Sequence, residues 1–143
     1  MISSAFPDVN VWLALNYPAH IHHEAADRWY GSSDPPPILV FCRQTQLSLF
    51  RLLSTEAILG EDTLSQRGCW TVYDEWIASG DAVFSEEPAS LEAALRLRSS
   101  SDSPSPKEWA DGYLAAFSFA VGVPLITFDR ALAGRVKGAV LLN

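Results

Sequence analysis

Two patterns of apolar and polar positions alternate along the chain and predict strands separated by helices. Short apolar runs bounded by turn residues are typical of buried strands, whereas apolar residues spaced three and four apart indicate one face of a helix. Runs of the first kind occupy residues 3–7, 38–41 (ILVF), 82–84 (AVF), 124–128 (PLITF) and 139–143 (AVLLN). We therefore expect five strands.

Helical spacing fills the segments between these runs. It predicts helices over 9–15, around Ala25, Ala26 and Trp29, over 46–53, 63–79 and 88–98, and directly after Asp129. One more helix is expected to begin at Ser105 as N-cap, with Pro106 in its first turn and Glu108 completing a capping box, and to run to Gly122. Strands that alternate with helices favour an α/β layer sandwich with a mainly parallel central sheet.

Turn-forming residues gather in SSDPPP at 32–37 and in SSSDSPSP at 99–106. Both segments are expected to be surface loops, and neither is long enough to separate two domains. The chain has 143 residues, of which 48% are hydrophobic and 19% charged. That length and composition are typical of a single globular domain, which we expect to span residues 1–143.

Other compositional features bear on location and chemistry. No apolar stretch approaches the roughly 20 residues that span a bilayer, and MISSAFPDVN lacks the features of a signal peptide, so we expect a cytoplasmic protein with no membrane segment. Cys42 and Cys69 are too few for a disulfide framework and are interpreted as buried thiols. The net charge of −7 argues against binding nucleic acid through a broad basic face. Divalent cations can still bridge an acidic pocket to phosphates.

Three aspartates stand where such a pocket would form. Asp8 follows the first predicted strand, Asp129 follows a late one, and Asp111 lies near the start of the helix between them. Parallel strands deliver their carboxyl ends to one sheet edge, where ligands collect. Carboxylates held close together repel one another unless a proton or cation neutralises them, and Mg²⁺ and Mn²⁺ prefer oxygen ligands. The arrangement predicts metal-assisted phosphodiester hydrolysis.

Four motifs occur in an order that resembles PIN-domain proteins, and in particular VapC-like toxins of type II toxin–antitoxin modules. They are PDVNVWLAL at 7–15, TQLSLFRLL at 45–53, DGYLAA at 111–116 and ITFDRAL at 126–132. The resemblance implies a PIN-like three-layer α/β/α sandwich and a Mg²⁺- or Mn²⁺-dependent endoribonuclease acting on RNA. It also implies a homodimer and a small cognate antitoxin, whose basic segment would pair with the acidic pocket.

The resemblance also assigns roles to single residues. It makes Asp8, Asp111 and Asp129 the metal ligands and catalytic residues, with Asn10 and Thr127 supporting them and Arg51 at a basic position of the second motif. Arg130 is expected to contact a phosphate, as is Arg51. Many PIN nucleases carry a glutamate where this chain has Ser48, and Gln46 and Glu56 lie nearby at other spacings. The number of metal ions therefore stays open.

Other interpretations of the same residues compete with a metal site. Asp8 and Asp129 could serve as helix caps, and Asp111 could pair with Lys107 four residues earlier. His20, His22 and His23 match no structural zinc spacing. A receiver-type Mg²⁺-binding phosphoacceptor domain would carry an adjacent acidic pair and a late lysine, which are missing here. A catalytically weak PIN-fold module that only binds RNA or protein is the remaining alternative.

Overall fold

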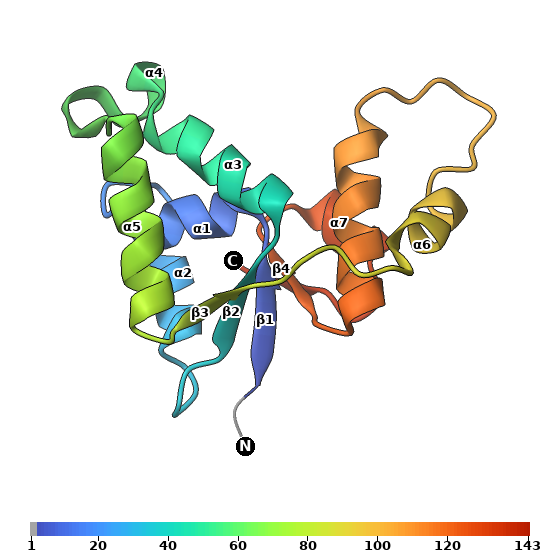
Figure 1. Cartoon of the computed structure of the whole chain (residues 1–143), viewed down its shortest axis with the longest axis horizontal. Helices are drawn as coiled ribbons and strands as arrows, with labels where there is room; N and C mark the ends of the chain where they lie inside the picture. The colour runs from blue at the N-terminus through green and yellow to red at the C-terminus, as the bar shows by residue number, and fades with distance from the viewer. Residues whose placement is uncertain (1–2) are drawn as a thin grey trace.

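Five parallel strands form the centre of the computed structural model, which describes residues 3–143 (Figure 1). The strands are β1 (Ser4–Pro7), β2 (Ile38–Phe41), β3 (Ala82–Phe84), β4 (Leu125–Thr127) and β5 (Val140–Leu141). Their order across the sheet is β3-β2-β1-β4-β5, so β1 lies in the middle. All five predicted strands and the parallel sheet are confirmed.

Helices cover both faces of this sheet and complete three layers (Figure 1). One layer contains α1 (Val9–Asn16), α2 (His23–Tyr30), α3 (Arg43–Leu53) and α5 (Gln66–Ala78). The other contains α6 (Leu91–Leu97), α7 (Glu108–Val121) and α8 (Arg130–Arg135). A short helix α4 (Glu56–Leu59) and the 3₁₀ turn η1 (Gly60–Asp62) join α3 to α5 and were not predicted. Within the described residues, no helix has the length and apolar character needed to cross a membrane.

Successive residues of β1, β2 and β4 contribute to different cores, one on each face of the sheet. Buried strand residues of the first core are Ala5, Leu39, Phe41, Ala82 and Ile126, and those of the second are Phe6, Val40 and Leu125. The indole of Trp12 is fully buried in the first core and stacks on Phe41, with ring centroids 3.8 Å apart. This two-sided burial explains why the strands are continuous apolar runs rather than alternating ones.

The predicted capping box at the start of α7 is wrong. The helix begins at Glu108, with Lys107 as N-cap and no side-chain cap hydrogen bond. Ser105 has a positive φ of 41° and its hydroxyl lies 2.7 Å from that of Ser103. The Glu108 carboxylate accepts a hydrogen bond from Arg135 at 3.0 Å. Both side chains of the expected box are thus engaged by other partners.

Three further helix boundaries differ from the prediction. Helix α5 starts after Ser65, whose hydroxyl accepts the N–H of Gly68 at 3.0 Å, rather than at residue 63. Helix α3 starts at Arg43, earlier than predicted, because the Thr45 hydroxyl caps the N–H of Cys42 at 3.1 Å. Helix α6 is shorter than the predicted span of 88–98. These differences leave the topology unchanged.

Leu49→Ala tests the packing of α3 on the sheet. The Leu49 side chain is fully buried, so its truncation should lower the free energy of unfolding by about 2–5 kcal/mol. Leu47 is 54% exposed on the same helix, and Leu47→Ala should change that free energy by less than about 0.5 kcal/mol. Urea denaturation measures both variants. Equal losses would contradict the described orientation of α3.

Candidate active site

The site is set by the pairing of β1 with β4. Pro7 lies opposite Ile126 in the parallel register, and the Asp8 N–H donates to the Ile126 carbonyl at 2.9 Å. Strand N–H groups alternate in direction, so the Pro7 nitrogen faces β2 and its missing proton costs no bond to β4. Asp8 and residues 127–129 therefore leave the carboxyl edge of the sheet side by side.

Asp8 is a buried carboxylate held by three hydrogen bonds. The residue is only 5% exposed to solvent. Oδ1 of its carboxylate accepts hydrogen bonds from the N–H groups of Asn10 at 3.1 Å and Val11 at 3.2 Å. Its Oδ2 accepts the hydroxyl of Thr127. Burial raises the pKa of the Asp8 carboxyl, the three hydrogen bonds oppose that rise, and the negative charge of Asp129 adds to it. Asp8 thus caps α1 while it lies within electrostatic range of Asp129.

Asp129 is connected to Asp8 through the hydroxyl of Thr127. That hydroxyl donates to Asp8 and accepts the Asp129 N–H at 2.9 Å. Oδ1 of Asp129 accepts the Leu132 N–H at 3.0 Å and so caps α8. Its Oδ2 has no hydrogen bond among residues 3–143, and the residue is exposed. Both capping interpretations are confirmed, and a free carboxylate oxygen is left beside Asp8.

Asp111 has a different partner. Its carboxylate accepts a hydrogen bond from Nη2 of Arg135 at 2.8 Å, while Nη1 of Arg135 reaches Glu108 at 3.0 Å. The alternative pair with Lys107 is absent among the described salt bridges. No group of three or more His, Cys, Asp or Glu side chains in residues 3–143 is arranged to hold a metal ion. The structure brings Asp8 and Asp129 together and keeps Asp111 on Arg135.

The predicted supporting residues lie in several places. Asn10 contacts Asp8 through its backbone N–H, and its exposed side chain has no described hydrogen bond. Gln46 is buried and accepts a hydrogen bond from Arg43 at 2.5 Å. Ser48 is half-buried on α3 without a described side-chain hydrogen bond. Thr127 alone among the supporting residues bonds to an aspartate through its side chain.

The two predicted phosphate-contacting arginines are both exposed. Arg130 is the first residue of α8 and directly follows Asp129. Arg51 lies elsewhere and lines a cavity of about 370 Å³ together with Leu47 of α3 and Trp70 of α5. None of the three aspartates lines this cavity. Only Arg130 is therefore adjacent in the chain to a predicted metal ligand.

The sequence interpretation missed two residues beside the site. Arg135 binds Asp111, and no local signal predicts this pair because it depends on how α8 packs near α7. The ring of His22 stacks on Phe128, with centroids 4.5 Å apart and an angle of 18°. Phe128 precedes Asp129, so the histidine-containing loop reaches the edge of the site.

The donor chemistry of Asp8 and Asp129 fits a divalent cation. Mg²⁺ typically binds one or two carboxylates together with waters and substrate phosphates. The two aspartates provide hard oxygen ligands, the charge of Asp129 contributes to the raised pKa of the Asp8 carboxyl, and one oxygen of Asp129 has no described hydrogen bond. Asp111 could join this set only after leaving Arg135.

Comparison with known proteins identifies similar chains. Ribonuclease VapC41 of Mycobacterium tuberculosis, in strains CDC 1551 and H37Rv, is 40% identical over 128 residues, which cover 87% of this chain and 88% of VapC41. The crystal structure of Mycobacterium tuberculosis VapC20, described as a sarcin–ricin loop cleaving toxin, has a TM-score of 0.67 at 17% identity. That match covers 98% of this chain and all of VapC20. No family model matches the chain.

A second solved structure has the same fold. PAE2754 from Pyrobaculum aerophilum has a TM-score of 0.59 at 20% identity, covering 98% of this chain and 90% of the other. At such identities the two structural matches support the fold alone. The predicted PIN-like three-layer fold is confirmed.

Asp8→Asn should change how stability depends on pH when a chelator excludes metal. In the wild type, the unfolded chain releases the Asp8 proton near pH 3.8. The folded chain, in which the pKa of this carboxyl is raised, holds the proton to a higher pH. The wild type therefore loses stability between the two pKa values, and the asparagine variant lacks this loss. Denaturation in EDTA across a pH series measures the difference, which should grow above 3.8 and then level off. A constant offset between the profiles would contradict a raised pKa.

Proposed function

The chain belongs to the VapC family of ribonucleases, PIN-domain toxins of toxin–antitoxin systems, and from this premise we propose that it is a metal-dependent endoribonuclease. One observation carries the metal-dependent part of the proposal. Asp8 and Asp129 leave adjacent parallel strands and are joined through the hydroxyl of Thr127. Two carboxylates in that position are suited to a divalent cation and a phosphate.

Asp8 and Asp129 would hold Mg²⁺ or Mn²⁺. The bound ion would act as a Lewis acid toward a phosphate oxygen and an attacking water. Asp8 contributes a fixed orientation, since three hydrogen bonds leave its carboxylate little freedom. The Thr127 hydroxyl accepts a hydrogen bond from the Asp129 N–H, which fixes the backbone of Asp129 close to Asp8. We propose that Arg130, which directly follows Asp129 and is exposed, contacts a substrate phosphate.

Asp111 is proposed as a third ligand that Arg135 holds when no cation is bound. The guanidinium satisfies the carboxylates of Asp111 and Glu108 together. Because Arg135 is 45% exposed, exchange of this partner for a divalent ion costs a modest amount of free energy. Ser48 in place of a glutamate leaves the site with fewer carboxylates than many PIN nucleases have. That feature favours the weakly catalytic binding module as the second candidate function.

Partners and location are proposed from the family and from charge. A small antitoxin with a basic segment would complement the acidic site and the net charge of −7. The exposed side chains of Leu47 and Trp70, beside Arg51, are compatible with a protein contact such as a homodimer interface. A cytoplasmic location stays a prediction from the sequence.

Cleavage of RNA by the purified protein tests the proposed function. Wild-type protein should cleave structured RNA with Mg²⁺ or Mn²⁺ and not with EDTA. Asp8→Asn and Asp129→Asn should each lower the rate by about a hundredfold or more, because each removes a charge needed at the reacting phosphate. Asparagine retains an oxygen that can cap a helix, so α1 and α8 should stay folded in both variants.

Circular dichroism spectra of the variants provide the control for folding. Equal cleavage by wild type and both variants would identify a contaminating nuclease and contradict the assignment. Metal binding and RNA binding without cleavage would favour the second candidate, a binding module.

Arg135→Gln tests the exchange proposed for Asp111. Removing the guanidinium frees the Asp111 carboxylate, so Mn²⁺ affinity measured by calorimetry should rise about fivefold, the scale of one partly exposed ion pair. Arg96→Gln is the matched control, because its exposed pair with Glu92 lies elsewhere on α6. Unchanged affinity in Arg135→Gln would show that Asp111 takes no part in metal binding.

A further inference from the structure

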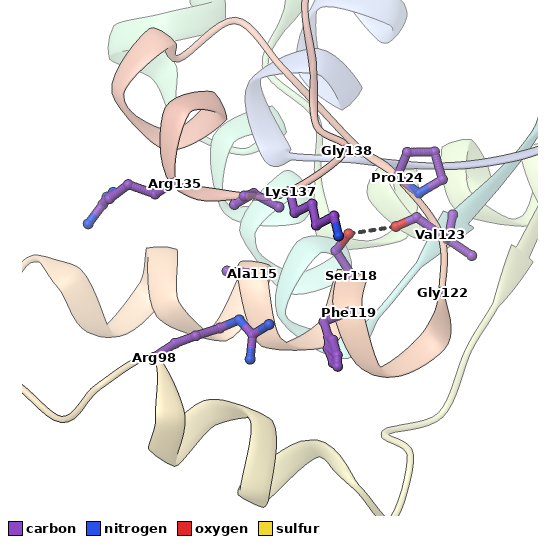
Figure 2. A pocket seen from close by; sticks show the side chains of 11 residues that line it. Arg98, Ala115, Ser118, Phe119, Gly122, Val123, Pro124, Arg135, Lys137 and Gly138 are labelled. Carbon is purple, nitrogen blue, oxygen red and sulfur yellow. Dashed lines mark hydrogen bonds between the residues drawn. The ribbon is translucent and has the colours of Figure 1, made fainter.

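A cleft of about 460 Å³ lies along α7 (Figure 2), and neither Asp8 nor Asp129 lines it. Residues from the end of α6, from α7 and from the segment that joins α8 to β5 line it. Figure 2 shows Arg98 and Lys137 extending from opposite sides over α7, where Ala115 and Ser118 form the wall between them. We call this cavity the basic cleft.

The charge of the basic cleft is opposite to that of the protein. Arg98, Arg135 and Lys137 are three of the ten Lys and Arg residues in a chain of net charge −7. Within the described residues, no Asp or Glu lines the cleft, and neither Arg98 nor Lys137 forms a salt bridge. Two cations without carboxylate partners facing one cavity indicate a site for an anion.

The basic cleft borders a second cavity, which Asp111 lines. That neighbouring cavity has a volume of about 230 Å³ and is lined by Glu108 and Asp111. The two cavities share Arg98, Ala115, Arg135 and Val136. These shared residues are compatible with a ligand longer than one phosphate group that contacts both cavities.

The cleft also contains an exposed aromatic side chain. Phe119 is 61% exposed on α7, and the Arg98 guanidinium lies 4.6 Å from its ring centroid. Aromatic rings beside cations are the usual platform for single-stranded nucleic acid, since bases stack on the ring and phosphates pair with the cations. An isolated inorganic anion would make no use of this ring.

We propose that the basic cleft binds single-stranded RNA at a distance from the cleaved bond, with Lys137 and Arg98 pairing with backbone phosphates and Phe119 stacking on a base. This inference rests on the proposed ribonuclease function and adds the path of the substrate. The wall of the cleft is preorganised, because Gly122 ends α7 with φ of 70° and the Ser118 hydroxyl bonds to the Val123 carbonyl at 2.6 Å.

Fluorescence anisotropy with a labelled oligouridylate of about ten nucleotides tests the proposal, in EDTA so that no metal-dependent cleavage occurs. Lys137→Gln should weaken binding about fivefold. It should also reduce the salt slope of log affinity by about 0.7, the value for one phosphate contact on a single strand. Lys137→Arg should retain both.

Phe119→Leu separates stacking from charge. It keeps an apolar side chain, so it should weaken binding about fivefold or more while leaving the salt slope unchanged. Arg67→Gln is the matched control for charge. Arg67 is exposed on α5, across the sheet from α7 (Figure 1), and its removal should change affinity by less than about twofold.

The outcomes distinguish this inference from the proposed function. Equal affinities for Lys137→Gln and Arg67→Gln, in a protein that cleaves RNA, would overturn the basic cleft alone. Loss of binding in Lys137→Gln in a protein that cleaves no RNA would support the cleft while the nuclease proposal fails. If Lys137→Gln instead weakens only the binding of a glutamate-rich peptide and leaves RNA binding unchanged, the cleft binds an acidic protein and the RNA proposal is wrong. If Lys137→Gln lowers thermal stability without lowering RNA affinity, the role of Lys137 is to stabilise the C-terminus of α7 with its positive charge. That result would also overturn the RNA proposal.

Discussion

The hydrogen bond from Thr127 to Asp8 is the contact on which the arrangement of the candidate site depends. A buried carboxylate without partners would be strongly destabilising, and this hydroxyl supplies one of the three bonds that Asp8 accepts. The contact exists only because β1 and β4 pair in parallel with Pro7 opposite Ile126. A slip of one residue would turn Thr127 to the other face of the sheet and leave the Asp8 carboxylate without it.

The same constraint explains why capping and metal binding are compatible. Asp8 and Asp129 each end a strand and begin a helix, and α1 and α8 pack on opposite faces of the sheet. Each carboxylate uses one oxygen for its helix, so the caps fix the orientation of the other oxygen. Oδ2 of Asp8 accepts the Thr127 hydroxyl, and Oδ2 of Asp129 has no described hydrogen bond. Helix formation thus orients the residues that would bind the cation.

The sequence predicts the features that depend on local pattern and chain order. Five apolar runs become five strands, and a strand that ends in aspartate before a helix predicts both the caps and the pairing of Asp8 with Asp129. It does not predict the partner of Asp111, because the pair with Arg135 joins residues 24 positions apart through helix packing. The capping box at Ser105 failed for a related reason, since Glu108 bonds to that same arginine. At this end of α7, both residues of the expected box have other partners.

Arg135 lies between the cavity of Asp111 and the basic cleft, and its charge acts on both. It lines both the cavity of Asp111 and the basic cleft, and its guanidinium pairs with two carboxylates. A cation bound at the carboxylates would compete for Asp111, and a guanidinium released from that pair would add positive charge beside the cleft. For an RNA strand that contacts both cavities, binding of the ion and of the strand would favour each other. A protein with a net charge of −7 could in this way hold RNA through a few local cations.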